Sequence, residues 1–584
     1  MTLTLGTADD DLARLRNAAA THRVVNLVGP LGVGKTRLLA RLDESVHVVD
    51  HVDDPAATPD PFDGPVVFAS RRPLRTRPAW ADLPMATVHV RPWTDREIHA
   101  YATSRGLDED AARVVVRYAG GVPLIAELLS VAVLDGAPVA RPGGAADLAA
   151  DLAAEEVVRR LRSERPAPPW RRILRLLAGV GVGDEELLDV EPDEFTALAA
   201  LSVVTRTELG LRVAEPYRTV LDMSYRWRRP IEHRAALTRA GQHVHRRLAI
   251  ADRHELRKKL AFEGIFLADE PYVRAMLFPA RSALPPVEIA GAADADAIGR
   301  LIREWALESE FDLRATDRLV DTWLADTTSR FHICRDDDGA PAALANLVPF
   351  AEAESGGVEP VTQQHTEELL ESAGGDGMFV ITGFWPDEAT GAAMLQRILG
   401  ASIDRGKAVI CTPKPEYQRL ALGLGFAHHG TTRHDTYGNG HSTHVFSQST
   451  KPGDLVEWLA RIAELTGRRP PPSYLGTQLT EALERIRTPS RLARSPLLAA
   501  PHTPTVPALR DWLTAAVESL CAGTVPVDAE AGRILRDYYL GGAGSHRKVA
   551  SRLHLSRATY FRRLAHGLAV VTERFGEDAS LRLS

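Results

Sequence analysis

The first hydrophobic segments of the chain are short and closely spaced. Val24–Val28 is apolar except for Asn26, Lys35–Leu42 has apolar residues at helical spacing, and Val46–Asp50 and Val66–Ala69 are again short apolar runs. Runs of this length are typical of strands buried on both faces, and a helix between two of them makes a βαβ unit. The pattern therefore predicts an α/β domain with a parallel sheet.

Further along, the spacing of apolar residues changes twice. A Pro/Gly stretch over 136–148 precedes a mostly helical region at 150–285, and strand-like runs return after Val287 around a helix at Ala389–Ser402. These runs are Phe331–Cys334, Met378–Thr382 and Ala408–Cys411. Residues 467–506 are rich in Pro, Arg and Ser and are predicted to be a partly ordered linker, followed by helices.

The pattern divides the chain into five parts of different fold class. We expect an α/β P-loop NTPase core at 1–135, a helical and winged-helix segment at 149–285, an α+β domain at 286–450, a helix and linker at 451–506, and an all-α domain at 507–584. A chain of 584 residues has room for about three to five domains, so the division agrees with its length.

Composition limits where the protein works. The net charge is -7, which argues against nucleic-acid binding by the whole surface but allows a local basic patch. Cys334, Cys411 and Cys521 are far apart and have no metal-ligand spacing, which favours a reducing compartment. We find neither a signal peptide nor an apolar run long enough for a membrane span, and we expect a bacterial cytoplasmic protein.

The strongest motif follows the first strand. Residues 29–36 (GPLGVGKT) match G-x-x-x-x-G-K-[ST] at every defined position. The glycines Gly29, Gly32 and Gly34 let backbone N–H groups surround phosphate oxygens, Lys35 can reach the β- and γ-phosphates, and Thr36 can hold Mg²⁺. The motif lies between a buried strand and a helix, as a phosphate-binding loop requires, so we expect ATP or ADP with Mg²⁺ as cofactors.

The metal also needs a carboxylate on a nearby strand. Asp50 ends the second apolar run, and Asp53 and Asp54 stand just behind it, after His51 and Val52, so Asp50 is the first candidate and the other two are alternatives. These acids could instead simply solvate a loop.

The order of four motifs resembles the STAND NTPases, the class that contains the NB-ARC and AP-ATPase regulators. The motifs are 29–36, 48–54, 68–74 (FASRRPL) and 120–124 (GGVPL). The resemblance implies that Arg71 senses the γ-phosphate, that Pro123 packs against adenine, and that residues 150–250 close over the nucleotide. His51 stands where the family has an acid, and the family's ADP-sensing histidine has no counterpart over Leu211–Tyr217, so we expect slow hydrolysis or none.

The region 287–450 resembles the GNAT acyltransferases, on the evidence of Tyr417 and the Leu-Gly-Phe at 424–426. In that family a loop R-x-x-G-x-[GA] binds the acyl-CoA pyrophosphate. Gly391 and Ala393 fit that pattern here, but Glu388 replaces the arginine and would repel the pyrophosphate, so acetyl transfer is not expected. The histidines that follow have no metal-ligand spacing and are interpreted as a polar hairpin: His428, His429, His434, His441 and His444.

The last domain contains two helices with a tight turn between them. Ser545 can cap a helix that runs to Leu553, His554 and Leu555 form the turn, and Ser556 can cap a helix at Arg557–Leu568. This string resembles the helix-turn-helix of bacterial regulators and of sigma-factor region four. Between residues 545 and 568 there is no acidic residue, and the predicted DNA contacts are Arg547, Lys548, Arg552, Arg557, Thr559, Arg562 and Arg563. A protein-interaction module with a basic face is the alternative.

Three functions remain open. The first is a nucleotide-switched, DNA-binding transcriptional regulator of STAND type, which accounts for both terminal motifs. The second is a STAND-type signalling or anti-phage defence ATPase whose C-terminus mediates assembly, and the third is a GNAT-type acyltransferase with regulatory domains. The expected partners are nucleotide, DNA, an unknown small-molecule or protein signal, and further copies of the chain, with no membrane.

Overall fold

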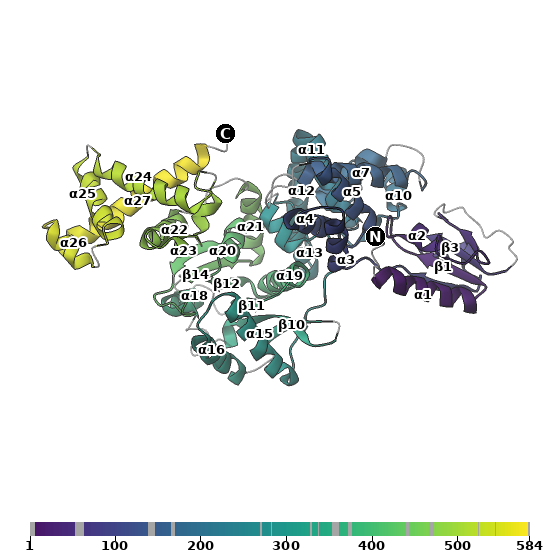
Figure 1. The fold of residues 1–584 in the computed structure, drawn as a ribbon, viewed down its shortest axis with the longest axis horizontal. Helices are drawn as coiled ribbons and strands as arrows, with labels where there is room; N and C mark the ends of the chain where they lie inside the picture. Colours follow the sequence, from purple (N-terminus) through teal and green to yellow (C-terminus); the bar gives the residue numbers. More distant parts are fainter. Residues whose placement is uncertain are drawn as a thin grey trace.

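The computed structural model describes most of the chain. The residues described are 6–52, 64–137, 146–164, 170–268, 271–281, 283–326, 330–336, 338–352, 361–371, 376–439, 443–465, 472–493, 495–500, 502–523, 525–542 and 545–581. They form a multidomain protein of mixed α and β structure, with the N-terminal sheet at one end of its long axis and the C-terminal helices at the other (Figure 1).

The N-terminal sheet is parallel, as the sequence predicted. Its strand order is β2-β3-β1-β4, and all three neighbouring pairs run parallel. The elements are α1 Gly6–Thr21, β1 Val24–Val28, α2 Lys35–Leu39, β2 His47–Val49, β3 Val66–Ser70, η1 Leu74–Thr76, η2 Pro78–Trp80 and β4 Ala86–His89. The α2 helix ends at Leu39, earlier than the predicted Leu42, and Ala40 to Leu42 form turns there.

Both faces of this sheet are covered. Val25 and Leu27 of β1 pack in a cluster with α1 and α2, while Val24 packs with Phe68 and Trp80 on the opposite face. The one polar residue of β1, Asn26, is buried, and its amide donates to Phe68 O and Ser70 Oγ and accepts from Leu74 N. Every polar group of that side chain therefore has a partner, which explains why an asparagine is tolerated in a core strand.

A helical segment, residues 95–277, follows the sheet. Its helices are α3 Asp95–Ser104, α4 Glu109–Ala119, α5 Pro123–Leu134, α7 Ala146–Leu161, α8 Trp170–Val180, α9 Glu185–Leu188, α10 Pro192–Ala199, α11 Tyr217–Arg228, α12 Pro230–Ile250, α13 His254–Phe266 and α14 Pro271–Leu277. It also holds a small antiparallel sheet of order β5-β7-β6, made of β5 Val182–Gly183, β6 Val204–Thr207 and β7 Gly210–Val213. One hydrophobic cluster connects this segment to α19 (Glu388–Arg405) and α21 (Pro452–Leu465) of the next region.

The middle region is a seven-stranded mixed sheet with helices. The strand order is β13-β14-β12-β11-β10-β9-β8, in which β11 and β12 run parallel and the other pairs run antiparallel. The strands are β8 Glu288–Ile289, β9 Phe331–Arg335, β10 Pro341–Pro349, β11 Met378–Phe384, β12 Lys407–Thr412, β13 Ala427–Thr431 and β14 His444–Ser449. The helices are η3 Ala292–Asp294, α15 Ala295–Glu308, α16 Leu313–Asp326, η5 Phe350–Glu352, η6 Gln363–His365, α18 Thr366–Glu371, α19 Glu388–Arg405, α20 Pro415–Gly423 and α21 Pro452–Leu465.

In its described residues the C-terminal region contains helices and turns but no strand, and it has its own hydrophobic core. Its elements are α22 Pro472–Arg485, α23 Pro489–Leu492, η7 Pro496–Ala499, α24 Val506–Cys521, α25 Pro526–Leu535, a π-helical turn η8 Arg536–Leu540, α26 His546–Arg552 and α27 Arg557–Leu581. The described part of 467–506 is therefore folded and is not the linker predicted from composition. Leu479, Leu483 and Ile486 recur at helical spacing and are buried in this core, which outweighs the prolines at the helix starts.

Within the part of the chain that is described, none of the helices has the length and apolar character that crossing a membrane requires.

Candidate functional site

The Gly-rich loop (residues 29–34) connects β1 to α2. Gly32 and Gly34 have φ angles of 75° and 111°, which glycine adopts without the strain a side chain would add. The ammonium group of Lys35 lies inside the loop and donates to Gly29 O at 2.6 Å and to Pro30 O at 3.1 Å. The loop thus already surrounds a cation, which is the geometry needed to place that cation against phosphate oxygens.

The predicted metal pair comes together at the mouth of this loop. The Thr36 hydroxyl donates to the Asp50 carboxylate at 2.7 Å, although β3 lies between β1 and the strand β2 that Asp50 follows. A hydroxyl and a carboxylate are oxygen ligands of the kind that Mg²⁺ prefers, so Thr36 and Asp50 fit the expected ion. His51 follows Asp50 with a φ of 60°, and its backbone N–H donates to the same carboxylate. Asp53 and Asp54 lie outside the described residues.

Arg71 follows β3 and contacts the helical segment. Its guanidinium pairs with Glu164, and Nη2 also donates to Arg160 O at 3.3 Å. The side chains of Arg71 and Glu164 are each only 6% exposed, so this pair is buried. The Glu164 carboxylate also accepts from the backbone N–H and the hydroxyl of Ser202, at 2.7 and 2.6 Å. The residue expected to sense the γ-phosphate is therefore engaged by a carboxylate of the helical segment.

Arg72 makes a second link to the same segment. Its Nη2 donates to Leu201 O at 2.6 Å and to Val204 O at 3.1 Å. The two arginines at the end of β3 consequently connect the sheet to the helical segment.

The Gly-Gly-Val-Pro-Leu motif lies against the Gly-rich loop. Pro123 is the first residue of α5, and the backbone N–H of Leu124 donates to Gly32 O at 3.2 Å. A Cβ at Gly32 would lie 2.5 Å from the Leu124 side chain, so a larger residue in the loop would displace α5.

Tyr217 is a contact that the sequence analysis missed. It begins α11, it is buried, and its hydroxyl donates to Leu31 O at 2.5 Å. Burial raises the pKa of this tyrosine above its ordinary value, so it remains a neutral donor. The range Leu211–Tyr217 contains no histidine, and the residue that reaches the loop is the tyrosine at its end.

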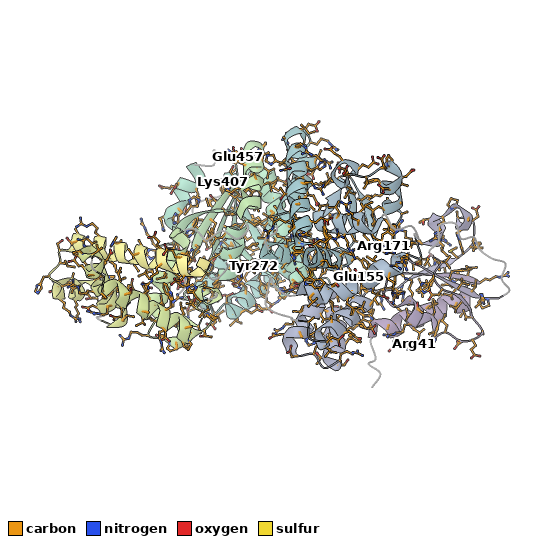
Figure 2. The ribbon with its side chains drawn as sticks, turned by 90° about the horizontal axis from the view of Figure 1, so that it is seen from above. Arg41, Glu155, Arg171, Tyr272, Lys407 and Glu457 are labelled. Atoms are coloured by element: carbon orange, nitrogen blue, oxygen red, sulfur yellow. The ribbon has the colours of Figure 1, made fainter. Side chains whose placement is uncertain are left out.

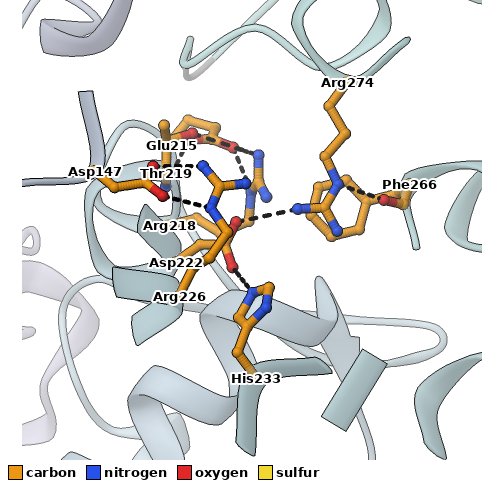
Figure 3. A network of polar contacts seen from close by, with 9 residues as sticks. All are labelled: Asp147, Glu215, Arg218, Thr219, Asp222, Arg226, His233, Phe266 and Arg274. Atoms are coloured by element: carbon orange, nitrogen blue, oxygen red, sulfur yellow. Dashed lines mark hydrogen bonds and ion pairs between the residues drawn. The ribbon is translucent and has the colours of Figure 1, made fainter. Parts of the chain in front are cut away.

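A buried polar network extends from α11 to α14 (Figure 3). The Asp222 carboxylate accepts from His233 Nε2 at 2.7 Å and from Arg274 Nη1 at 3.2 Å, and Arg274 Nε donates to Phe266 O at 2.8 Å. Burial opposes ionisation of Asp222, but the His233 hydrogen bond and the Arg274 charge together lower its pKa to about 2. The network therefore holds a charged carboxylate in the core, on the helix that also carries Tyr217.

In the middle region, the start of α19 is occupied by acidic side chains. Asp387 caps the helix by accepting from Ala389 N at 2.8 Å and from Thr390 N at 3.0 Å. Glu388 pairs with Arg117 of α4, whose Nε donates to it at 2.9 Å. The N–H groups that could bind a pyrophosphate at this helix end are used by Asp387 instead.

The histidines of the middle region form hydrogen bonds across β13 and β14. His428 Nε2 lies 3.0 Å from His444 Nδ1, and His429 Nε2 lies 2.7 Å from Ser447 Oγ. Among the described residues, no group of three or more His, Cys, Asp or Glu side chains is arranged to hold a metal ion. His441 lies outside them.

The C-terminal basic helices meet at a left-handed turn. Ser545 accepts from Lys548 N at 3.3 Å, His554 has a φ of 54°, and Ser556 accepts from Thr559 N at 3.2 Å. Both predicted caps are therefore present, although α27 continues to Leu581, well past the predicted Leu568.

The residues predicted to contact DNA differ in their solvent exposure and in whether they are paired with other side chains. Five of them are exposed: Arg547, Lys548, Arg552, Arg557 and Arg562. By contrast, Arg563 pairs with Glu530 at 2.6 Å, and the Thr559 hydroxyl lies 2.9 Å from Ser556 Oγ. The Arg552 guanidinium is 3.6 Å from the Asp537 carboxylate but remains largely solvent-exposed.

Comparison with known proteins gives little further information. No protein-family model matches the sequence, and no curated protein matches it. A solved structure that it resembles is a signal transduction ATPase with numerous domains (STAND) that has a tetratricopeptide repeat sensor, from Pyrococcus horikoshii. The identity is 11%, the TM-score is 0.18, and the match covers 98% of this chain and 97% of that one. A TM-score this low does not establish a shared fold, so the function must be argued from the site.

Proposed function

We propose that the chain is a nucleotide-switched regulator of STAND type that binds ATP or ADP with Mg²⁺ and acts on DNA through its C-terminal helices. The observation that carries the nucleotide site is the 2.7 Å contact between Thr36 and Asp50 at the mouth of the Gly-rich loop. It joins a loop that can surround phosphates to a carboxylate that can hold the metal, and these residues are 14 positions apart in the sequence.

The contacts of the helical segment favour a switch over a fast ATPase. Arg71 pairs with Glu164, and Tyr217 contacts the Gly-rich loop. A bound nucleotide would therefore compete with the helical segment for Arg71 and share the Gly-rich loop with it. His51 replaces the acid that would activate water, which supports slow hydrolysis or none. A γ-phosphate that attracts Arg71 would favour one arrangement of the two parts, as a two-state switch requires.

The C-terminal helices supply the proposed DNA contact. The two serine caps and the left-handed His554 support a helix-turn-helix, and the exposed cations at its surface could neutralise phosphates. Arg557 and Arg562 lie on the second helix, the one that would enter the major groove.

For the middle region we propose a GNAT-like fold without acyl transfer. The parallel pair β11 and β12, with α19 between them in sequence, supports the likeness. Asp387 and Glu388 at the start of α19 oppose the binding of an acyl-CoA pyrophosphate.

The test is DNA binding by the intact protein to its own upstream region, with ATP, with ADP and without nucleotide. Lys35→Ala, which removes the cation of the loop, is the matched variant. We expect DNA affinity to depend on the nucleotide and this dependence to vanish in Lys35→Ala. ATP binding without any DNA binding would favour the signalling or defence ATPase, with the C-terminal helices as an assembly surface.

A further inference from the structure

The middle region contains a cavity that the nucleotide site does not account for. Its volume is about 80 Å³, and its wall comes from β11, β12, α19 and α20. By the same measure a water molecule needs about 10–15 Å³, so a small organic molecule fits. The wall is mostly aliphatic and aromatic and includes Trp385, Leu395, Tyr417, Ala421 and Phe426.

Two residues of this wall each have a buried polar side-chain atom without a partner among the described residues. Thr382 Oγ1 and Trp305 Nε1 are both buried without a hydrogen bond, and both residues are only 5% exposed. Two other hydroxyls of the wall have partners: Ser402 donates to Ile398 O, and Thr412 accepts from Lys414 N. Buried donors are costly unless paired, so Thr382 and Trp305 indicate that the cavity accepts a molecule with a hydrogen-bond acceptor.

The charge around the cavity is balanced. Lys414 also lines the wall, and burial lowers its pKa. Glu416 and Glu308 lie close enough to oppose that shift, so the ammonium group already has acidic neighbours. An uncharged molecule therefore suits this cavity better than an anion.

Helix α14 connects the cavity to the nucleotide site. Leu277 at its end forms part of the wall, and Gln396 of α19 donates to Leu277 O at 2.6 Å. Tyr272, near its start, lies in the middle of the molecule and donates to Glu416 O at 2.9 Å (Figure 2). Arg274 of the same helix reaches Asp222 of α11, the helix whose first residue contacts the Gly-rich loop (Figure 3).

We propose that this cavity is a sensor site for a small, uncharged, mostly apolar molecule with one carbonyl oxygen, and that α14 transmits its occupancy to the nucleotide site. The transmission rests on the proposed nucleotide switch, whereas ligand binding in the cavity does not. Such a ligand differs from an acyl-CoA because it has no pyrophosphate group. Asp387 and Glu388 at the start of α19 oppose the binding of a pyrophosphate but not of this ligand.

Binding is tested on the full chain with cyclopentanone as the probe and cyclopentane as the probe without an acceptor, by saturation-transfer NMR. Thr382→Val removes the unpartnered hydroxyl and keeps the side-chain shape. Thr443→Val is the matched control, because Thr443 has a buried hydroxyl that is also without a partner but does not line the cavity.

We expect Thr382→Val to weaken cyclopentanone binding about fivefold, leave cyclopentane unaffected and not reduce the Tm, since the lost hydroxyl had no partner. Thr443→Val should bind both probes as the unmodified chain does. Ala421→Phe, which fills the cavity, should abolish binding of both. Absence of cyclopentanone binding at millimolar concentration, or equal losses in Thr382→Val and Thr443→Val, would overturn the site.

Transmission is tested by measuring ATP and ADP affinity with and without saturating cyclopentanone. We expect the ratio of the two affinities to change about threefold or more, and Arg274→Lys to reduce that change. Unchanged nucleotide affinities with cyclopentanone bound would overturn the transmission. A chain that binds cyclopentanone but no nucleotide would instead contradict the proposed function and leave the sensor site standing.

Discussion

The hydroxyl of Tyr217 donates to the carbonyl oxygen of Leu31, across 186 positions of sequence. Leu31 belongs to the Gly-rich loop, and Tyr217 begins a helix whose Asp222 lies in the buried network. A backbone carbonyl of the loop is thus held by the helical segment, so movement of that segment away from the sheet must break this bond.

The first prediction follows from that bond. Tyr217→Phe removes the hydroxyl and keeps the ring, and it should lower the free energy of unfolding by about 1 kcal/mol and speed nucleotide release. Stopped-flow displacement of a fluorescent nucleotide measures the release rate. Tyr225→Phe is the control in the same helix, because its hydroxyl interacts with Glu232 rather than the loop. Equal release rates for the two variants would contradict a role of Tyr217 at the loop.

The second prediction concerns the proposed metal pair. Asp50→Asn keeps the size of the side chain but removes its charge, so Mg²⁺-dependent nucleotide affinity should fall about tenfold or more, equal to about 1.4 kcal/mol. Affinity measured in EDTA should not change. Calorimetric titrations with and without Mg²⁺ provide both values. If the Mg²⁺-dependent affinity stays unchanged, the metal role moves to Asp53 or Asp54.

The third prediction concerns the buried pair of Arg71 and Glu164. Glu164→Gln keeps the shape of the side chain and one acceptor oxygen for Ser202 but removes the negative charge that holds Arg71. A freed Arg71 should raise affinity for ATP more than for ADP, by about threefold to tenfold. Glu156→Gln alters an ion pair with Arg159 and Arg160 on α7, the helix that ends just before Glu164, and it should leave the ATP-to-ADP ratio unchanged. A ratio that responds equally to both changes would argue against a sensing role for Arg71.

The fourth prediction separates two adjacent arginines of α27. Arg562 is exposed, whereas Arg563 is paired with Glu530. Arg562→Ala should therefore reduce DNA affinity. It should also reduce the slope of log affinity against log salt concentration by about one, the equivalent of one phosphate contact, and Arg563→Ala should change both quantities less. Fluorescence anisotropy at several salt concentrations measures both effects. If neither variant changes DNA binding, the basic face serves protein contacts.

The fifth prediction concerns pH and the buried histidine His444. Burial, with repulsion from His428, lowers the pKa of His444 to about 3, below its ordinary value of 6.5. Between these values the unfolded chain binds a proton that the folded chain does not. The contribution to stability is therefore complete above pH 6.5 and is lost as the pH falls toward 3, by about 1.4 kcal/mol per pH unit for one such group.

His444→Gln should reduce this slope, which denaturant unfolding at pH 4 to 7 would measure. His566→Gln is the control, because His566 is 40% exposed. An unchanged slope in His444→Gln would show that another group causes the acid sensitivity.

The local parts of this fold could be predicted from sequence. The Gly-rich loop, the parallel strands around it, the Ser545 and Ser556 caps and the tight turn at His554 each depend on a few neighbouring residues. Composition was misleading at 472–500, where prolines and arginines surround a buried apolar series that includes Leu479 and Leu483. Proline at a helix start indicates a helix as readily as a linker.

The long-range parts of the site could not be predicted in the same way. Thr36 and Asp50 are close in sequence and carry a recognisable motif, whereas Arg71 and Glu164 are 93 positions apart and Glu164 belongs to no motif. Tyr217 reaches Leu31 only because the helical segment packs on the loop, which depends on the whole hydrophobic core between them. Contacts of this kind follow from tertiary packing rather than from local pattern.

Helix α27 has 25 residues, so it is a rod of about 37 Å. Its far half packs against α22, and Gln478 of α22 donates to His444 of the middle region at 3.2 Å, while the basic residues lie at the opposite tip. A rigid rod amplifies rotation at its base: turning through about 5° would carry the tip roughly 3 Å sideways at this length. A small adjustment where α22 meets the sheet would thus become a displacement of several ångströms at the basic tip, enough to change how that tip meets a binding partner.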